Sequence, residues 1–150
     1  MVDNPPPGYP RIAPYLLYED PAAALDWLSR AFNLRERTRH EHDGVIDHAE
    51  MEFADGLIML ANPGPDYRSP RRLGSATSLV HIYVDDIYAH YERAKSAGAE
   101  IRTEPKDKPY GTVQYSAVDP EGHLWLFSEQ VREPETEWRI EPQPEPASRP

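Results

Sequence analysis

The apolar and polar positions of this chain follow the same order twice. Residues 15–20, with the sequence YLLYED, form an apolar strand pattern that ends in acidic residues, and residues 81–86, HIYVDD, repeat it 66 positions later. A segment with apolar residues at helical spacing follows each of them, over residues 21–32 and 87–98. The two halves of the chain are therefore predicted to begin with the same strand–helix unit.

Both predicted helices carry signals for their ends. Asp20 stands where an N-cap is expected, and Pro21 fits the first helical position. In the second half, Asp86 is the predicted cap and Gly98 the predicted C-terminal stop. These signals place the helix boundaries independently of the apolar spacing.

Three strand-like segments separated by turns follow each helix. They cover residues 35–42, 45–53 and 57–61 in the first half, and residues 100–104, 112–118 and 123–127 in the second. Gly56 and Gly122 in the last turns are also 66 positions apart, so the same offset is expected throughout. A single βαβββ unit leaves one face of its sheet uncovered. We therefore predict an α+β fold in which two paired βαβββ modules form a curved mixed sheet around a cup.

Composition separates this body from its two ends. The 17 prolines are concentrated in the terminal segments. We predict a flexible N-terminal arm over residues 1–10, a two-module domain over residues 11–130 with modules at 11–63 and 76–130, and a Pro-rich acidic tail over residues 131–150. A solvated tail is the favoured interpretation, and the alternative is that Trp138 and Ile140 fold back onto the body.

Charge and residue content narrow the function classes. The formal net charge is −10, which argues against nucleic acid as a partner, because phosphate binding needs clustered Lys and Arg. Arg68, Arg71 and Arg72 form one basic cluster in a Pro/Gly loop, read as a solvated loop or, alternatively, as a clamp for an anionic substrate. There is no cysteine, and no segment approaches the roughly 20 apolar residues of a membrane span. We expect a cytoplasmic protein without a membrane partner.

The pattern resembles the vicinal oxygen chelate superfamily, which includes glyoxalases, bleomycin-resistance proteins and dioxygenases, and is most similar to its PhnB-like glyoxalase branch. The resemblance covers residues 10–130, and the segments that carry it are YLLYEDPAAALDWL at 15–28, HAEM at 48–51, VDD at 84–86, AGA at 97–99 and VDPEGHLW at 118–125. It implies the glyoxalase/bleomycin-resistance fold and a homodimer.

The resemblance also implies where metal ligands would stand. Metal-dependent members take mostly His and Glu ligands from the first and last strands of each module. The corresponding positions here are Ala13, Leu79, Leu126 and Leu60, or Met59 after a slip of one residue. None of these offers an oxygen or nitrogen ligand from its side chain. We expect no metal and no other cofactor.

Three polar residues remain candidates for chemistry. His48 and Glu50 share one face of their strand, and His81 is predicted to face the cup. Together they could form an acid–base group or a displaced metal site. The alternative is that His48 and Glu50 bond within the sheet while His81 is a polar residue of the pocket wall.

Strand alternation predicts an apolar and aromatic lining for the cup. Besides Leu79, Leu124 and Leu60 or Met59, the residues expected to contact a ligand are Tyr15, Leu17, His81, Tyr83, Tyr115 and Leu126, with Tyr110 and Tyr115 at the rim. Trp125 is assigned to the core, and His40, His42 and His90 are expected to be exposed and without a role.

Three functions stay open. The first is binding of a small, partly aromatic molecule without catalysis. The second is a metal-free lyase or isomerase that uses His, Tyr or Glu as acid–base groups in the same cup. The third is a purely structural dimeric module.

Overall fold

The two predicted modules are present in the computed structural model, which describes residues 1–139 and residue 141. Module 1 contains β1 (Tyr15–Leu17), α1 (Pro21–Phe32), β2 (Arg35–His42), β3 (Val45–Phe53) and β4 (Gly56–Ala61). Module 2 contains β5 (Leu79–Tyr83), α3 (Ile87–Ser96), β6 (Glu100–Asp107), β7 (Thr112–Val118) and β8 (Leu124–Gln130). The short helix α2 (Pro70–Leu73) lies between the modules, and the 3₁₀ turn η1 (Thr136–Trp138) follows β8.

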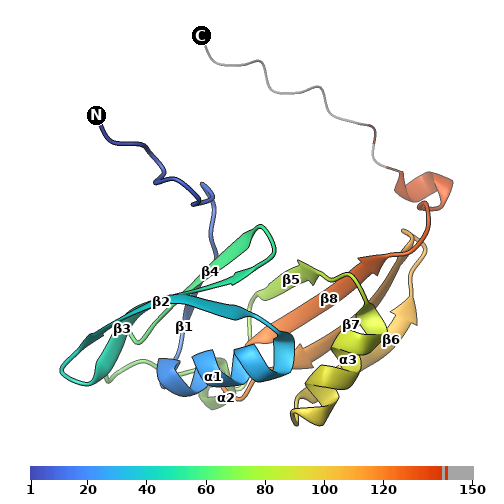
Figure 1. Cartoon of the computed structure of the whole chain (residues 1–150). Helices are drawn as coiled ribbons and strands as arrows, with labels where there is room; N and C mark the ends of the chain where they lie inside the picture. Colours follow the sequence, from blue (N-terminus) through green and yellow to red (C-terminus); the bar gives the residue numbers. More distant parts are fainter. Residues whose placement is uncertain (140, 142–150) are drawn as a thin grey trace.

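Each module builds a mixed four-stranded sheet with the same strand order. The orders are β1-β4-β3-β2 and β5-β8-β7-β6, and in both the first strand pairs in parallel with the last. Figure 1 shows α1 and α3 side by side on one side of the two sheets. The predicted βαβββ repeat and the fold class are confirmed.

The helix boundaries follow the predicted caps. The Asp20 carboxylate accepts a hydrogen bond from the backbone N–H of Ala23 at 3.1 Å, and Asp86 accepts one from Ala89 at 3.0 Å. Each bond satisfies an N–H group of the first turn that has no partner within the helix. Both helices thus begin where the sequence indicates.

The constant 66-residue offset does not extend through the last strands. Tyr15 pairs with Met59, whereas His81 pairs with Leu126, so the first strands are 66 positions apart and the last strands 67. Of the two alternatives predicted for the cup, Leu60 and Met59, Leu60 does not line it, because its side chain is fully buried among the core residues. Because side chains alternate along a strand, the slip of one residue places Met59 on the face without helices instead.

One hydrophobic core joins the modules through the two helices. Phe32 at the end of α1 lies with its ring centre 4.7 Å from that of Phe127 and 5.4 Å from that of Trp125, both on β8. The Arg93 guanidinium of α3 donates hydrogen bonds to the backbone carbonyls of Ser29 and Arg30. Trp125 is fully buried, as predicted.

The prediction that His90 is exposed is wrong, because its side chain belongs to this core. Its side chain is almost completely buried. Nε2 lies 2.8 Å from the Phe32 carbonyl oxygen, which can only accept, so Nε2 carries the proton and Nδ1 accepts from the Tyr115 hydroxyl. Burial lowers the pKa of His90, so the ring stays neutral and both of its nitrogens are satisfied in that form.

A buried carboxylate holds the last turn of module 2 against module 1. Asp119 accepts hydrogen bonds from the Tyr18 hydroxyl at 2.7 Å and from the Trp125 indole N–H at 3.1 Å. It also accepts from the backbone N–H groups of Glu121 and His123, both at 3.0 Å. The Asp119 side chain therefore links the end of β1 to the core of module 2.

The arginines of the connecting loop take part in structural contacts. Arg71 forms an ion pair with Glu100 at 3.0 Å and donates to the Pro120 carbonyl, while Arg72 pairs with Glu19. A Cβ atom on Gly122, whose φ is +90°, would lie 2.6 Å from the backbone nitrogen of Arg71. Glycine is thus required where α2 crosses the turn. These contacts argue against the substrate clamp for Arg71 and Arg72.

Both terminal segments make contacts with the body. Tyr9 donates from its hydroxyl to Glu50 on β3, and the Arg37 guanidinium lies 4.4 Å from the centre of its ring. At the other end, the ring of Trp138 meets that of Tyr110 edge-on, with centres 5.3 Å apart. For Trp138 the fold-back alternative holds, whereas Ile140 and residues 142–150 lie outside the described residues.

Candidate functional site

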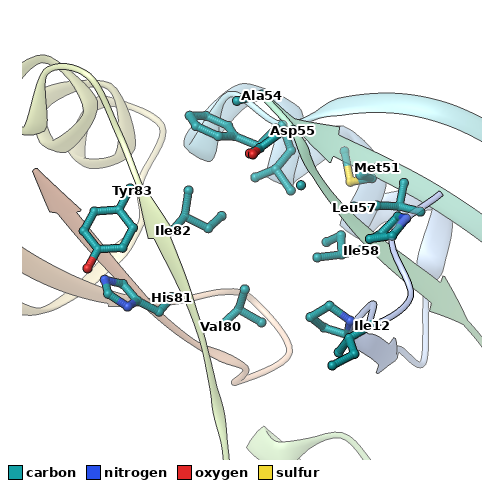
Figure 2. A pocket seen from close by; sticks show the side chains of 15 residues that line it. Ile12, Met51, Ala54, Asp55, Leu57, Ile58, Val80, His81, Ile82 and Tyr83 are labelled. Carbon is teal, nitrogen blue, oxygen red and sulfur yellow. The ribbon is translucent and has the colours of Figure 1, made fainter. Parts of the chain in front are cut away.

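A cavity of about 330 Å³ lies between the two modules. Strand β5 supplies one side, and the β3–β4 hairpin supplies the other, with the segment before β1 completing the wall (Figure 2). The lining is mostly apolar and includes Ile12, Met51, Leu57, Ile58, Val80 and Ile82. Its volume and composition are typical of a small-molecule site.

His81 and Tyr83 border this pocket at β5. Their ring centres are 4.8 Å apart, and Figure 2 shows both rings on the side of β5 opposite to Val80 and Ile82, whose side chains point toward Met51 and Ile58. His81 Nε2 lies 2.7 Å from the hydroxyl of Ser128 on β8. Burial lowers the pKa of His81, so the imidazole is neutral near pH 7. The Tyr83 side chain is 60% exposed, on the face of sheet 2 that the helices do not cover.

A second polar group lies on the face of sheet 1 that the helices do not cover. Tyr15 Oη is 2.7 Å from His48 Nδ1, and His48 Nε2 is 3.0 Å from Glu50 Oε2. The other carboxylate oxygen of Glu50 accepts the Tyr9 hydroxyl at 2.9 Å. Burial raises the pKa of Glu50, but the hydrogen bonds from His48 and Tyr9 outweigh this effect, and the pKa lies below its ordinary value. Glu50 is therefore a carboxylate at neutral pH.

The structure separates the predicted polar candidates into these two groups. His48 and Glu50 bond to each other within β3, as the second of the two interpretations predicts, while His81 bonds to Ser128 in the other sheet. Within the described part of the chain, no group of three or more His, Asp and Glu side chains is arranged to hold a metal ion. The proposed joint site of His48, Glu50 and His81 is not formed by the single chain.

The remaining predicted ligand contacts are Leu17, Leu126 and Tyr115, and none of them lines the inter-module pocket. Leu17 follows Tyr15 on β1, and Leu126 pairs with His81 in sheet 2; neither lines the inter-module pocket. The prediction that Tyr115 lies at the rim and contacts a ligand is wrong. Its side chain is fully buried, and its ring packs against Phe127. Because Ser116 is the residue that pairs with Leu126, strand alternation turns Tyr115 toward the helices and away from the rim.

The positions that the fold family would use for metal do not fit a cation. In the observed register, Met59 lies beside Tyr15 and Leu126 beside His81. Leucine offers no ligand atom, and the methionine thioether is a poor ligand for hard divalent ions. The side chains at the positions that the resemblance implies, Ala13, Met59, Leu79 and Leu126, thus differ chemically from the His and Glu set of metal-dependent members.

Several pocket residues lie outside the predicted set. Pro10, Ile12 and Pro14 precede β1 and have no strand or helix periodicity, so the sequence offers no signal that they form a wall. Met51 and Ile58 lie on the helix side of their strands, where strand alternation predicts core residues. They line the cavity together with Val80 and Ile82 of the other module, a relation that alternation alone does not predict.

Comparisons with known proteins agree with the fold. Residues 10–127 match the family model described as Glyoxalase/Bleomycin resistance protein/Dioxygenase superfamily. The crystal structure of TioX from Micromonospora sp. ML1 is 35% identical with a TM-score of 0.68, covering 82% of this chain and all of TioX. A curated relative, uncharacterized protein Rv0887c of Mycobacterium tuberculosis (strain ATCC 25618 / H37Rv), is 32% identical over 130 residues, which cover 83% of this chain and 76% of that protein.

A more distant structure shows the same fold alone. The fosfomycin resistance protein FosX from Listeria monocytogenes is 14% identical and covers 88% of this chain and 98% of its own, with a TM-score of 0.62. The repeated module, the strand order and the family model therefore lead to one conclusion. The chain belongs to the glyoxalase/bleomycin resistance protein/dioxygenase superfamily.

Proposed function

We propose that this protein binds a small, partly aromatic molecule in the pocket between its two modules. The observation that carries the proposal is the pocket lining, which is apolar apart from His81, Tyr83, Asp55 and a few backbone groups. A planar apolar ligand would remove this surface from water, with Tyr83 at the border of the pocket. A ligand without negative charge is favoured, since Asp55 lines the pocket and the whole chain is acidic.

The functional test uses the two tyrosines that are equally exposed. Tyr83 lines the pocket, whereas Tyr88 lies on α3 and is not among the lining residues; each is 60% exposed. We expect a screen of planar aromatic compounds to raise the melting temperature of the wild-type protein for at least one compound. Tyr83→Ala should weaken its binding about fivefold or more, because a lost aromatic contact costs about 1 kcal/mol. Tyr88→Ala should bind like the wild type, and equal loss in both variants would argue against the pocket.

We also propose that the protein forms a homodimer. Strands β1 and β5 pair on one side only, and Leu79 and Tyr83 of β5 are about half exposed. Uncovered strand edges with apolar side chains are ready to pair with another chain. Light scattering on the purified protein should give twice the chain mass of 17.2 kDa. A mass equal to one chain over the micromolar range would contradict this proposal.

Two finer assignments stay predictions. No helix in the part of the chain that the structure describes is long and apolar enough to cross a membrane. The cytoplasmic location is a prediction that fractionation of the source cells would test. The PhnB-like branch is likewise a prediction, to be tested by a phylogeny of the family built around the TioX and Rv0887c relatives.

A further inference from the structure

A second cavity, of about 370 Å³, lies between α1 and the turn that joins β7 to β8. We call it the α1 cavity; among the residues that the structure describes, it shares no lining residue with the inter-module pocket. Ala23, Trp27 and Leu28 of α1 and Pro120 of the turn give it a mostly apolar lining. Its volume and lining are typical of a small-molecule site, at a place that the proposed function does not use.

The wall of the α1 cavity is held in place by hydrogen bonds within the chain. The Glu121 carboxylate accepts the backbone N–H of Glu19 at 2.5 Å and that of Asp20 at 2.9 Å. The Tyr18 hydroxyl donates to Asp119 at 2.7 Å. These bonds fix the turn against the start of α1, so a ligand would enter a preformed space and would have little of the protein to order.

The lining of the α1 cavity carries an excess of negative charge. Its described residues include four carboxylates and one guanidinium, which belong to Asp20, Asp26, Asp119, Glu121 and Arg30. Arg30 is already paired with Asp26 at 2.9 Å. Burial raises the pKa of Glu121, and the negative charge of Asp119 adds to this effect. A cation in the cavity would be attracted by the carboxylates and would offset the cost of keeping Glu121 charged.

Trp27 supplies an aromatic surface beside these charges. Its side chain is half-buried, and its ring meets that of Phe32 edge-on, with centres 4.9 Å apart, which fixes its position. Asp20, Ala23 and Trp27 follow one another at spacings of three and four residues, so they lie on one face of α1. An indole ring contacts both aromatic rings and cations favourably. One ligand can therefore meet the indole and the carboxylates together.

We infer that the α1 cavity is a second binding site, and that it takes a small aromatic molecule carrying a protonated amine. The ring would contact Trp27 and the apolar lining, and the ammonium group would lie toward the carboxylates of Asp20 and Asp26. This inference goes beyond the proposed function, because it concerns another cavity and a ligand that must be positively charged.

The charge requirement is tested with two probes of similar shape, 2-phenylethylamine and 2-phenylethanol, of which only the amine is protonated at neutral pH. The indole ¹H–¹⁵N signal of Trp27 reports on the cavity, and Trp27→Phe identifies this signal by its loss. We expect saturable shifts, with the amine binding about threefold to tenfold more tightly at low salt and losing this preference as salt is added. Equal affinity for both probes, or no saturable shift with the amine, would overturn the inference.

The role of the rim charge is tested at the caps of the two helices. Asp20→Asn removes a charge from the α1 cavity but keeps a side chain that caps a helix as well as aspartate does. Its affinity for the amine should fall about twofold to fivefold while that for the alcohol stays unchanged. Asp86→Asn is the matched control, since Asp86 caps α3 and does not line this cavity. Equal effects of the two substitutions would contradict the role of Asp20.

The position of the probes is tested with two neighbouring alanines of α1, both exposed, of which Ala23 lines the cavity and Ala22 does not. Ala23→Leu should weaken the binding of both probes about tenfold by filling the space, and Ala22→Leu should bind like the wild type. Tyr83→Ala should also leave the Trp27 shifts unchanged. If it abolishes them, the probes bind in the inter-module pocket and the assignment is wrong. A Trp27 signal that shifts with protein concentration alone would show that a second copy fills the cavity, which would also overturn it.

Discussion

Replacing Asp119 with alanine is expected to lower the free energy of unfolding by about 3–5 kcal/mol. The side chain is 1% exposed and accepts from Tyr18, from Trp125 and from two backbone N–H groups. Removing the carboxylate leaves these donors buried without a partner, and each unsatisfied donor costs about 1–3 kcal/mol. Urea unfolding followed by tryptophan fluorescence would measure the loss.

Two further variants make the Asp119 result specific. Asp119→Asn retains an oxygen for the backbone N–H groups but turns an amide donor toward the indole N–H of Trp125, so an intermediate loss is expected. Asp26→Ala removes a carboxylate whose ion pair with Arg30 is exposed, and it should change stability by less than about 1 kcal/mol. A loss for Asp119→Ala as small as that for Asp26→Ala would contradict the proposed link between the modules.

Phe32→Ala is expected to destabilise the protein by about 3–5 kcal/mol. Phe32 is fully buried at the end of α1, and its ring contacts the aromatic rings of Trp125 and Phe127 in the other module. The cavity left by its removal would lie where the two modules share their core. Chemical denaturation of the variant, monitored by circular dichroism, gives the change in the unfolding free energy.

The same experiment tests whether the modules fold as one unit. Because Phe32 belongs to a core shared by both modules, the variant should still unfold in a single transition at a lower urea concentration. Leu73→Ala serves as the control, since Leu73 is 63% exposed on α2 and its loss should have little effect. Two separate transitions in the wild type, with Phe32→Ala shifting only one of them, would show that the modules fold independently.

The sequence predicts the modules well because their signals are local. The caps at Asp20 and Asp86 and the helical spacing after them depend on neighbouring residues only. His90 also carries a local signal, since it lies three positions after Ile87 and four before Ala94, on the apolar stripe of α3. A polar residue at a buried helical position can be satisfied by tertiary partners, here Phe32 and Tyr115.

The candidate site is less predictable because it depends on registers and on the relation between modules. Strand β7 is buried on both faces over most of its length, so its alternation does not reveal which way Tyr115 points. The longer turn after β7 shifts the last strand by one residue, which exchanges Leu60 for Met59. The segment before β1 has no strand or helix pattern, although Pro10, Ile12 and Pro14 line the pocket.

We expect the inter-module pocket beside His81 and Tyr83 to bind an aromatic molecule. The most direct measurement is a crystal structure of the protein soaked with the compound that raises its melting temperature most. We predict electron density for that compound between β5 and the β3–β4 hairpin, in contact with Ile82, Met51 and Ile58. Density at another place, with the pocket occupied only by water, would contradict binding in this pocket.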